Sequence, residues 1–376
     1  MEKAELKKSI SKIRKLITQR DYGLINSGIE LARSLNNPTI YEELLKDCSI
    51  EGNGSLVGNK IFSGSDPALV YLYYALLNLI AYAPEGSNLD KSLKHSNITI
   101  IDLMLGAYMS YKSFNWTELP SGISCFKKLK RFHMYGCESL MNLDFLSENT
   151  NLESLSLHSC YALQNLDGLT KTTNLDYLVL NSCHSLNNLD GLINLTSLKT
   201  LKIKNSRNIQ NTDCMRNLNS LTNLHLEGCE NIQMFNKERK NVMKFNGLSN
   251  LSDITSLNII SCPIKNVDFL ANLTNLRELD LNNCRTLMNV DGLANLTKIT
   301  SLNLTYCQSL ENVDGLANLT NLTELYLGYC DALKNLDSLA NLSNLTELRL
   351  TGCSSLESFD GITDLPNFNR IMIKLL

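Results

Sequence analysis

The hydrophobic pattern in the carboxyl-terminal part of the chain repeats every 23 residues, with copies that begin at residues 275, 298, 321 and 344. The apolar positions of the copy at 321 are Leu322, Leu325, Leu327, Leu333, Leu336, Leu339 and Leu342. The first three follow the alternation of a short strand, and the later ones recur every third position. Self-similarity at a fixed short period predicts that each copy forms one turn of a solenoid.

One turn is too small to be stable alone. Ordering each residue costs about 1–2 kcal/mol of backbone entropy, whereas a buried leucine returns about 1.5–3 kcal/mol. The leucines of a single copy therefore do not offset the cost of ordering it. Stacked copies share one continuous core, so the pattern predicts a stack of neighbouring turns.

The repeats extend over most of the chain. An irregular first strand is expected near residues 100–105, and regular turns begin near 126, 151, 174, 197, 220, 253, 275, 298, 321 and 344. A last strand is expected from residue 367, with Phe368, Ile371 and Ile373 in the leucine positions. We therefore predict a solenoid of about 11 turns plus a terminal strand over residues 97–376. The turn at 220 is longer than the others because of a polar, basic insertion at 235–240, which is either a solvated loop or a contact site.

Residues 1–96 do not repeat and have the pattern of a helical domain. Ile10, Ile13 and Ile17 lie on one helical face. Asn37 followed by Pro38 has the composition of a helix start, a further helix is expected over 68–83, and residues 49–66 are expected to form a loop. We interpret residues 1–96 as an N-terminal cap over the first turn, with a partner-binding module as the alternative.

The pattern L-x-x-L-x-L followed by a cysteine resembles that of the leucine-rich repeat family. Two residues separate Cys330 from Leu333, as in the cysteine-containing variant, and N-V-D-G-L-A-N-L is similar to the short repeats of bacterial internalin-type proteins. The resemblance implies an α/β solenoid, a horseshoe with a concave parallel β-sheet. It also implies a binding scaffold rather than an enzyme.

Cysteine and aspartate recur at fixed positions of the repeat. Nine of the 12 cysteines share one inward position: Cys137, Cys160, Cys183, Cys229, Cys262, Cys284, Cys307, Cys330 and Cys353. Free cysteine packs as a small hydrophobe, so the row predicts a buried, reduced stack and a cytoplasmic location. A route of export without a cleaved signal peptide is the alternative. The Asp of the N-x-D-G-L segment is expected to be a helix N-cap.

The residues between the strand leucines are expected to face solvent on the concave side, because neighbouring strand residues alternate between faces. We predict a partner-binding surface there. Its residues are Arg131, His133, Tyr135, His158, Tyr177, Lys202, Lys204, His225, Glu278, Asp280, Glu324, Tyr326 and Arg349. The first half of this face is basic and aromatic, whereas the second half is largely acidic, and exposed aromatic and arginine side chains are typical of interface hot spots.

Composition and motifs narrow the function. A net charge of −3 and a pI of about 6.0 argue against a nucleic-acid partner, and the stretch 68–83 is too short to span a membrane. His133 and His158 are too few for a metal site, and we find no motif of an enzyme or a cofactor site. The prediction is a non-catalytic scaffold that binds a protein partner, with weak self-association through the C-terminal strand. The alternative is an exported internalin-like effector that binds a carbohydrate or a host cell-surface ligand.

Overall fold

The computed structural model describes residues 3–17, 22–45, 48–50, 56–58, 79, 100–104, 123–124, 126–209, 212–229, 245–363, 365 and 372–374. The chain divides into two compact units, Met1–Leu175 and Asp176–Leu376. The predicted boundary at residues 96 and 97 lies outside the described residues. The insertion at 235–240 and the helix expected over 68–83, apart from Leu79, also lie outside them.

The first unit begins with three helices, α1 (Lys3–Ile17), α2 (Tyr22–Leu35) and α3 (Pro38–Leu45). Ile10, Ile13 and Ile17 are buried on one face of α1, as the periodicity predicts. The Oδ1 of Asn37 accepts a hydrogen bond from the backbone N–H of Thr39 at 3.0 Å, which satisfies one of the donors left open at the start of α3. The helices are confirmed, and their role as a cap remains a prediction.

The stretch expected to be a loop over 49–66 contains a short hairpin. Strand β1 (Cys48–Ile50) pairs antiparallel with β2 (Leu56–Gly58), and Ile50 lies opposite Leu56. The expectation of a loop was therefore wrong for these residues. The β-branched residues Ile50 and Val57 favour strand structure, and the sequence EGNGS between the strands has the composition of a turn.

The first unit also contains parallel strands that come from successive turns. Strand β3 (Ile100–Met104) pairs with β4 (Arg131–Tyr135), which pairs with β5 (Ser154–His158). Short 3-10 helices η3 (Asp144–Leu146) and η4 (Asp167–Leu169) follow β4 and β5. The predicted first strand near residues 100–105 is confirmed.

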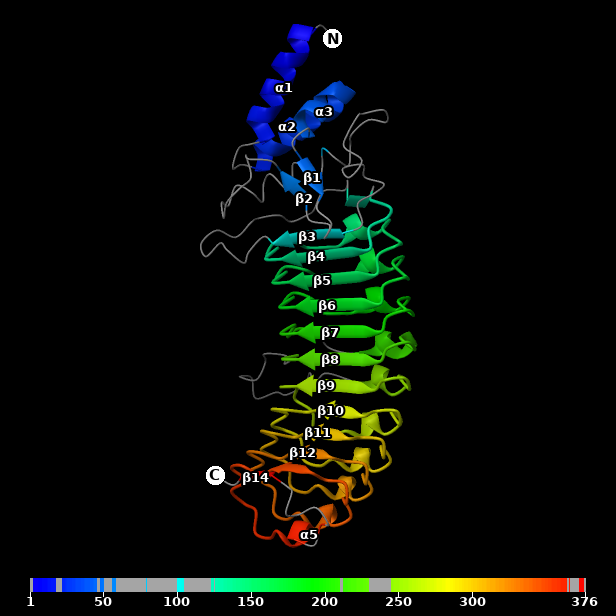
Figure 1. Cartoon of the computed structure of the whole chain (residues 1–376), viewed down its shortest axis with the longest axis vertical. Helices are drawn as coiled ribbons and strands as arrows, with labels where there is room; N and C mark the ends of the chain where they lie inside the picture. Colours follow the sequence, from blue (N-terminus) through cyan, green and yellow to red (C-terminus); the bar gives the residue numbers. More distant parts are fainter. Residues whose placement is uncertain are drawn as a thin grey trace. The chain divides into compact units, whose positions relative to one another are not determined.

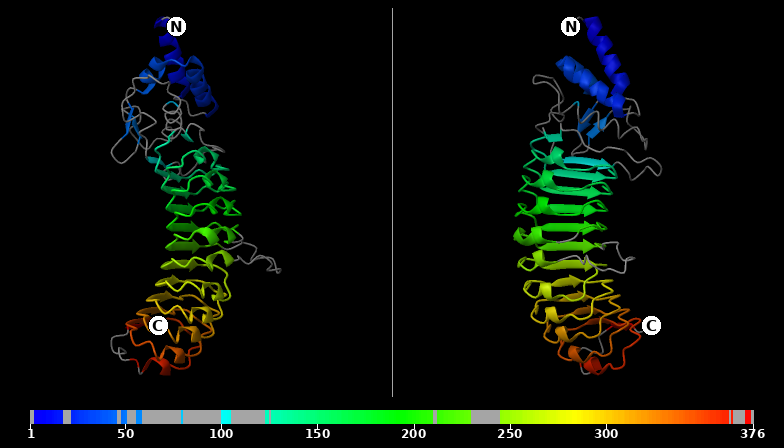
Figure 2. Two further views of the ribbon diagram at one scale, coloured as in Figure 1. Left: turned by 90° about the vertical axis from the view of Figure 1, so that its right-hand side faces the viewer. Right: turned by 180° about the vertical axis from the view of Figure 1, so that it is seen from behind.

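The second unit continues the same design from β6 to β14, and its strands all run in one direction (Figure 1). The strands are β6 (Tyr177–Asn181), β7 (Thr200–Lys204), β8 (Asn223–Glu227), β9 (Ser256–Ile260), β10 (Glu278–Asp280), β11 (Ser301–Asn303), β12 (Glu324–Tyr326), β13 (Glu347–Arg349) and β14 (Met372–Lys374). The short helices are η5 (Asp190–Leu192), η6 (Asp213–Asn217), η8 (Asn246–Leu248), η9 (Asp268–Leu270), η10 (Asp291–Leu293), η11 (Asp314–Leu316), η12 (Asp337–Leu339) and α5 (Asp360–Thr363). In both views of Figure 2 these helices form a column beside the strands.

The repeated leucines form the core of each unit. In the turn at 321, Leu325 and Leu327 of the strand region and Leu333, Leu336 and Leu339 of the return segment are all buried. Equivalent leucines of adjacent turns lie opposite one another, as Leu302 does to Leu325. The core is therefore shared between turns, which confirms the predicted solenoid.

The recurrent aspartate is not the N-cap that we expected. Asp144 is the first residue of η3, and the residue before it makes no side-chain cap hydrogen bond. The Oδ1 of Asn142 accepts the backbone N–H of Asp144 at 3.1 Å, and the pair Asn335 and Asp337 repeats this bond at 3.2 Å. The asparagine two positions earlier thus orders the turn, because its short amide mimics a backbone acceptor.

The cysteine stack is present as free thiols. All ten cysteines whose side chains are described are free, and the nine of the repeat row are buried except Cys353, which is partly buried. The Sγ atoms of Cys284, Cys330 and Cys353 lie 3.1, 3.2 and 2.9 Å from carbonyl oxygens of the preceding turn. Ser206 takes the same position, and its Oγ donates to the carbonyl of Lys204 at 3.2 Å. The position therefore selects a small side chain that can donate a hydrogen bond.

The last strand has a different register from the one predicted. Leu348 of β13 lies opposite Ile373 of β14, and Glu347 lies opposite Met372. The sequence pattern had placed Ile371 opposite Leu348, so the prediction was wrong by two residues. Strand residues alternate between the two faces with a period of two, so a pairing shifted by two residues fits the same hydrophobic alternation. The alternation alone therefore does not determine the register.

Candidate partner-binding face

The solvent-facing side of the parallel strands, here called the sheet face, carries the predicted site residues. Exposed and buried residues alternate along β4 and β7, so Arg131, Lys202 and Lys204 project from the side opposite to the strand leucines. The predicted residues fall into separate groups along each unit rather than into one cluster. The structure gives their positions, and their role in binding remains a prediction.

In the first unit, aromatic contacts join β4 to β5. The rings of Tyr135 and His158 stack at 4.3 Å with an interplanar angle of 12°, and the Nε2 of His133 lies 3.4 Å from the Oγ of Ser154. Arg131 is exposed on the same strand. Burial, and then the nearby charge of His133, lowers the pKa of His158. Both effects favour the neutral imidazole in the stack.

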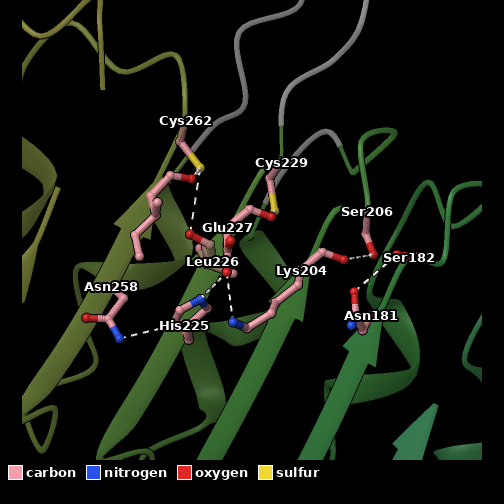
Figure 3. A network of polar contacts seen from close by, with 11 residues as sticks. Asn181, Ser182, Lys204, Ser206, His225, Leu226, Glu227, Cys229, Asn258 and Cys262 are labelled. Atoms are coloured by element: carbon pink, nitrogen blue, oxygen red, sulfur yellow. Dashed lines mark hydrogen bonds and ion pairs between the residues drawn. The ribbon is translucent and has the colours of Figure 1, made fainter. Parts of the chain in front are cut away.

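The second unit holds a chain of four polar side chains, here called the Lys204 network. It consists of Lys204 on β7, His225 and Glu227 on β8, and Asn258 on β9 (Figure 3). The Oε2 of Glu227 lies 2.8 Å from the Nζ of Lys204 and 2.9 Å from the Nε2 of His225. The Nδ2 of Asn258 lies 3.0 Å from the Nδ1 of His225. One carboxylate therefore receives two donors from two adjacent strands.

The network sets the protonation states of its members. The hydrogen bond from Lys204 is the main cause that lowers the pKa of Glu227, which remains ionised. Burial is the main cause that lowers the pKa of His225, and it outweighs the opposing hydrogen bond to Glu227. A neutral imidazole that accepts from Asn258 at Nδ1 and donates to Glu227 from Nε2 satisfies both contacts. His225 therefore joins two strands without adding a charge.

Tyr177 and Lys202 form a neighbouring contact on β6 and β7. The Nζ of Lys202 lies 5.8 Å from the centroid of the Tyr177 ring, within the range of a cation–π attraction. Lys204 is paired with Glu227 and Lys202 lies over a ring. The basic half of the face that the sequence predicts is thus partly neutralised by its own neighbours.

The acidic residues of the face differ from one another in environment. Glu278 is exposed on β10, whereas burial raises the pKa of Asp280 against the opposing hydrogen bonds from Asn282 and Asn303. The Oδ1 of Asp280 accepts the backbone N–H of Asn282 at 2.9 Å. Asp280 therefore has a structural use, because its carboxylate satisfies a backbone donor just beyond the end of the strand.

Charged and aromatic side chains meet again at β12 and β13. The guanidinium carbon of Arg349 lies 4.6 Å from the centroid of the Tyr326 ring, and the Nε of Arg349 donates to Oε1 of Glu347 at 2.7 Å. The Oε2 of Glu324 accepts from the Oγ of Ser301 at 2.9 Å. Tyr326 and Arg349 are thus brought together, and Glu324 and Glu347 lie opposite each other on the same two strands.

Sequence reasoning missed three residues that organise the face. Glu227, Asn258 and Glu347 lie on the predicted face but were not among the predicted site residues. The signal that could have found two of them is a partner side chain two positions away on the same strand. His225 hydrogen-bonds to Glu227, and Arg349 forms an ion pair with Glu347. A period of two places such a pair on one face.

The fold and the sheet face define a leucine-rich repeat solenoid. Residues 104–233 and 252–371 match the family model of the BspA type leucine rich repeat region, in six copies. The chain belongs to this family. Leucine-rich repeat proteins of this kind generally bind protein partners.

The chain is similar to solved structures of internalins from Listeria monocytogenes. It matches internalin InlF at 18% identity over 81% of this chain and 93% of that one, with a TM-score of 0.47. It matches internalin C2 at 27% identity over 51% and 76% of the two chains, with a TM-score of 0.40. It matches the functional domain of InlJ, described as including a cysteine ladder, at 20% identity over 76% and 65%, with a TM-score of 0.44. No curated protein matches the chain.

The part of the chain that the structure describes contains neither a metal-binding cluster nor a membrane-spanning helix. No group of three or more His, Cys, Asp or Glu side chains there is placed to hold a metal ion, and this includes His133 and His158. Among the same residues, no helix has the length and apolar character needed to cross a membrane.

Proposed function

We propose that this protein is a non-catalytic scaffold that binds a protein partner through the sheet face. The observation that carries the proposal is the Lys204 network with its flanking Lys202 and Tyr177. It is a partly exposed set of charged and aromatic side chains, held in place by neighbouring strands. Pre-ordered side chains lose little rotamer entropy on binding.

The charges on this face favour a polypeptide with both acidic and basic side chains over a nucleic acid or a membrane. Lys204 and Glu227 lie 2.8 Å apart, and Arg349 has a carboxylate partner at 2.7 Å. Paired charges of this kind set orientation and partner choice more than they add affinity. The free thiols along the stack support a reducing, cytoplasmic location as part of the proposal.

The experiment is a pull-down from native lysate that compares the wild-type chain with Lys202→Glu/Lys204→Glu. We expect the double variant to lose the captured partner while it retains its unfolding transition, because both side chains lie on the surface. The matched control is Lys298→Glu/Lys334→Glu, which makes the same charge change at exposed residues outside the strands. Equal capture by all three chains would overturn the proposal.

A further inference from the structure

A hollow of about 310 Å³ lies on the sheet face of the second unit, above Gly328. Its walls come from three adjacent turns and include Thr305, Tyr326, Tyr329 and Arg349. Gly328 has the same position in its turn as Thr305 and Thr351 in the turns on either side. A side chain at Gly328 would therefore project into the hollow.

Packing does not require glycine at residue 328. A Cβ atom there would lie 3.4 Å from the carbonyl oxygen of Thr351 and 3.5 Å from Cγ2 of Thr305, which are ordinary contact distances. The backbone does not require it either, because Gly328 is outside the group of glycines with positive φ, Gly136, Gly228 and Gly352. What the missing side chain does provide is an open surface between two aromatic residues.

Tyr329, which lines the hollow, and Tyr306, which stacks on it, both have an unusual backbone conformation. Tyr306 and Tyr329 have φ of +63° and +57°, at a turn position that Ser, Asn and Gly fill elsewhere in the repeat. Their rings stack at 4.6 Å with an interplanar angle of 4°, yet they are 41% and 40% exposed. Bulky residues adopt this conformation rarely and at a cost. Large rings in place of small polar residues are unfavourable for the turn itself and favourable for contact with a ligand.

Two of the polar side chains around the hollow already have hydrogen-bond partners. Arg349 donates to Glu347 at 2.7 Å and lies over the Tyr326 ring. The Oδ1 of Asn303, at the edge, accepts the backbone N–H of Thr305 at 3.0 Å. A site that selects a sugar presents several hydrogen-bonding groups to the sugar hydroxyls. Here the Arg349 guanidinium and the Asn303 oxygen are bonded elsewhere, and much of the lining is carbon from the tyrosine rings, a threonine methyl and the glycine backbone. Such a surface favours a neutral, apolar occupant.

We propose that the hollow above Gly328 is an anchor pocket for one large aromatic side chain of a polypeptide partner. The proposal rests on the proposed function and adds the chemistry of the bound residue. The volume lies at the lower end of the range of about 300–1,000 Å³ for ligand pockets, as suits a single side chain. Interface hot spots pair aromatic and arginine residues with a buried anchor of the partner, and Tyr326, Tyr329 and Arg349 supply one side of such a pair.

The test uses N-acetyl-tryptophanamide as the probe and methyl β-glucopyranoside as its comparator, measured by saturation-transfer NMR on the intact chain. We expect millimolar binding of the amide and at least tenfold weaker binding to Gly328→Thr, because a threonine side chain would project into the hollow and narrow it. Asn282→Thr introduces the same residue at the equivalent position of the turn at 275 and should bind the probe as the wild type does. Gly328→Ala should give an intermediate result.

Three outcomes overturn the anchor pocket. They are no binding of the amide, equal binding to Gly328→Thr, or a stronger signal from the glucoside than from the amide. The probe does not depend on the partner, so these results leave the proposed function intact. If Lys202→Glu/Lys204→Glu abolishes partner capture and Gly328→Thr does not reduce it, the scaffold function stands and the anchor pocket is refuted. Thermal unfolding of Gly328→Thr shows whether the variant is folded.

Discussion

The Nζ of Lys204 on β7 lies 2.8 Å from the Oε2 of Glu227 on β8. About a third of each side chain is exposed, at 35% and 33%, so water screens the pair and its contribution to stability is modest. We expect Lys204→Glu to cost up to about 1 kcal/mol in the free energy of unfolding, since an attractive pair becomes a repulsive one. Urea unfolding at low ionic strength measures this loss.

The exchanged pair Lys204→Glu/Glu227→Lys is the control for that prediction. It restores opposite charges at the same two positions, so most of the lost stability should return. If the double variant were as unstable as the sum of the two single variants, the Lys204–Glu227 contact would not contribute. High salt should reduce the difference between the variants.

Substitution by alanine should change the free energy of unfolding at one glycine of the repeat and leave it nearly unchanged at another. A Cβ at Gly292 would lie 2.4 Å from the carbonyl oxygen of Val267, so the backbone must shift, and we expect a loss of about 1–3 kcal/mol. A Cβ at Gly328 would have no neighbouring atom closer than 3.4 Å. Alanine there should therefore leave the free energy of unfolding nearly unchanged. Chemical unfolding of both variants decides the matter, and a similar loss at both sites would contradict it.

The equivalent position in another turn shows that a small side chain can be accommodated there. Ser338 stands where Gly292 stands in its own turn, and its Oγ donates to the carbonyl of Val313 at 3.0 Å. The return segment can therefore open enough to admit a small side chain that gains a hydrogen bond. Alanine at Gly292 gains no such bond, and Gly292→Ser should be less destabilising than Gly292→Ala.

The solenoid could be predicted from the sequence because its determinants are periodic. Each leucine and each cysteine has the same neighbours in every turn, so one copy predicts the next. The hairpin β1–β2 and the register of β14 were not predicted because they occur once, and no second copy constrains them. The Asn–Asp turn was assigned to the wrong residue, since both side chains recur together and only the geometry shows which one accepts the N–H.

The site could be predicted only in part. Alternation along a strand identifies which residues share a face, and it placed Lys204, His225 and Tyr326 there. It does not give the pairing between strands, so the partial neutralisation of Lys204 by Glu227 was missed. The hollow was missed because it also depends on neighbouring turns. Gly328 has no side chain, whereas Thr305 and Thr351 at the same position of the adjacent turns do.

The buried thiols predict a loss of stability at alkaline pH. Burial raises the pKa of Cys307 and of Cys214 to about 12, whereas an unfolded thiol has a pKa of about 8.5. Below pH 8.5 both states are protonated and stability is unaffected. Between about pH 8.5 and 12 only the unfolded state loses protons, so the free energy of unfolding falls by about 1.4 kcal/mol per pH unit for each such thiol. Unfolding with urea and a reductant at pH 8, 9 and 10 measures the slope.

One serine variant separates this effect from general alkaline damage. Cys307→Ser removes one buried thiol at a position where Ser206 is already accommodated, and it should make the slope shallower by about one thiol. Identical slopes for the wild type and Cys307→Ser would refute the prediction.

The terminal strand should contribute to stability and determine self-association. Glu347, Leu348 and Arg349 of β13 pair with the three residues of β14, and a net contribution of about 0.5–1.5 kcal/mol per hydrogen bond predicts a loss on the order of 2 kcal/mol for a chain that ends at residue 366. A chain that ends at residue 374 keeps β14 and is the matched control. An exposed strand edge is a template for pairing with a second chain. The mass of the intact chain measured by light scattering should therefore rise weakly with concentration. The chain ending at 366 lacks β14 and should not show this rise. Equal thermal stability of the two truncated chains would show that β14 does not stabilise β13, and a monomer in every sample would rule out association through this strand.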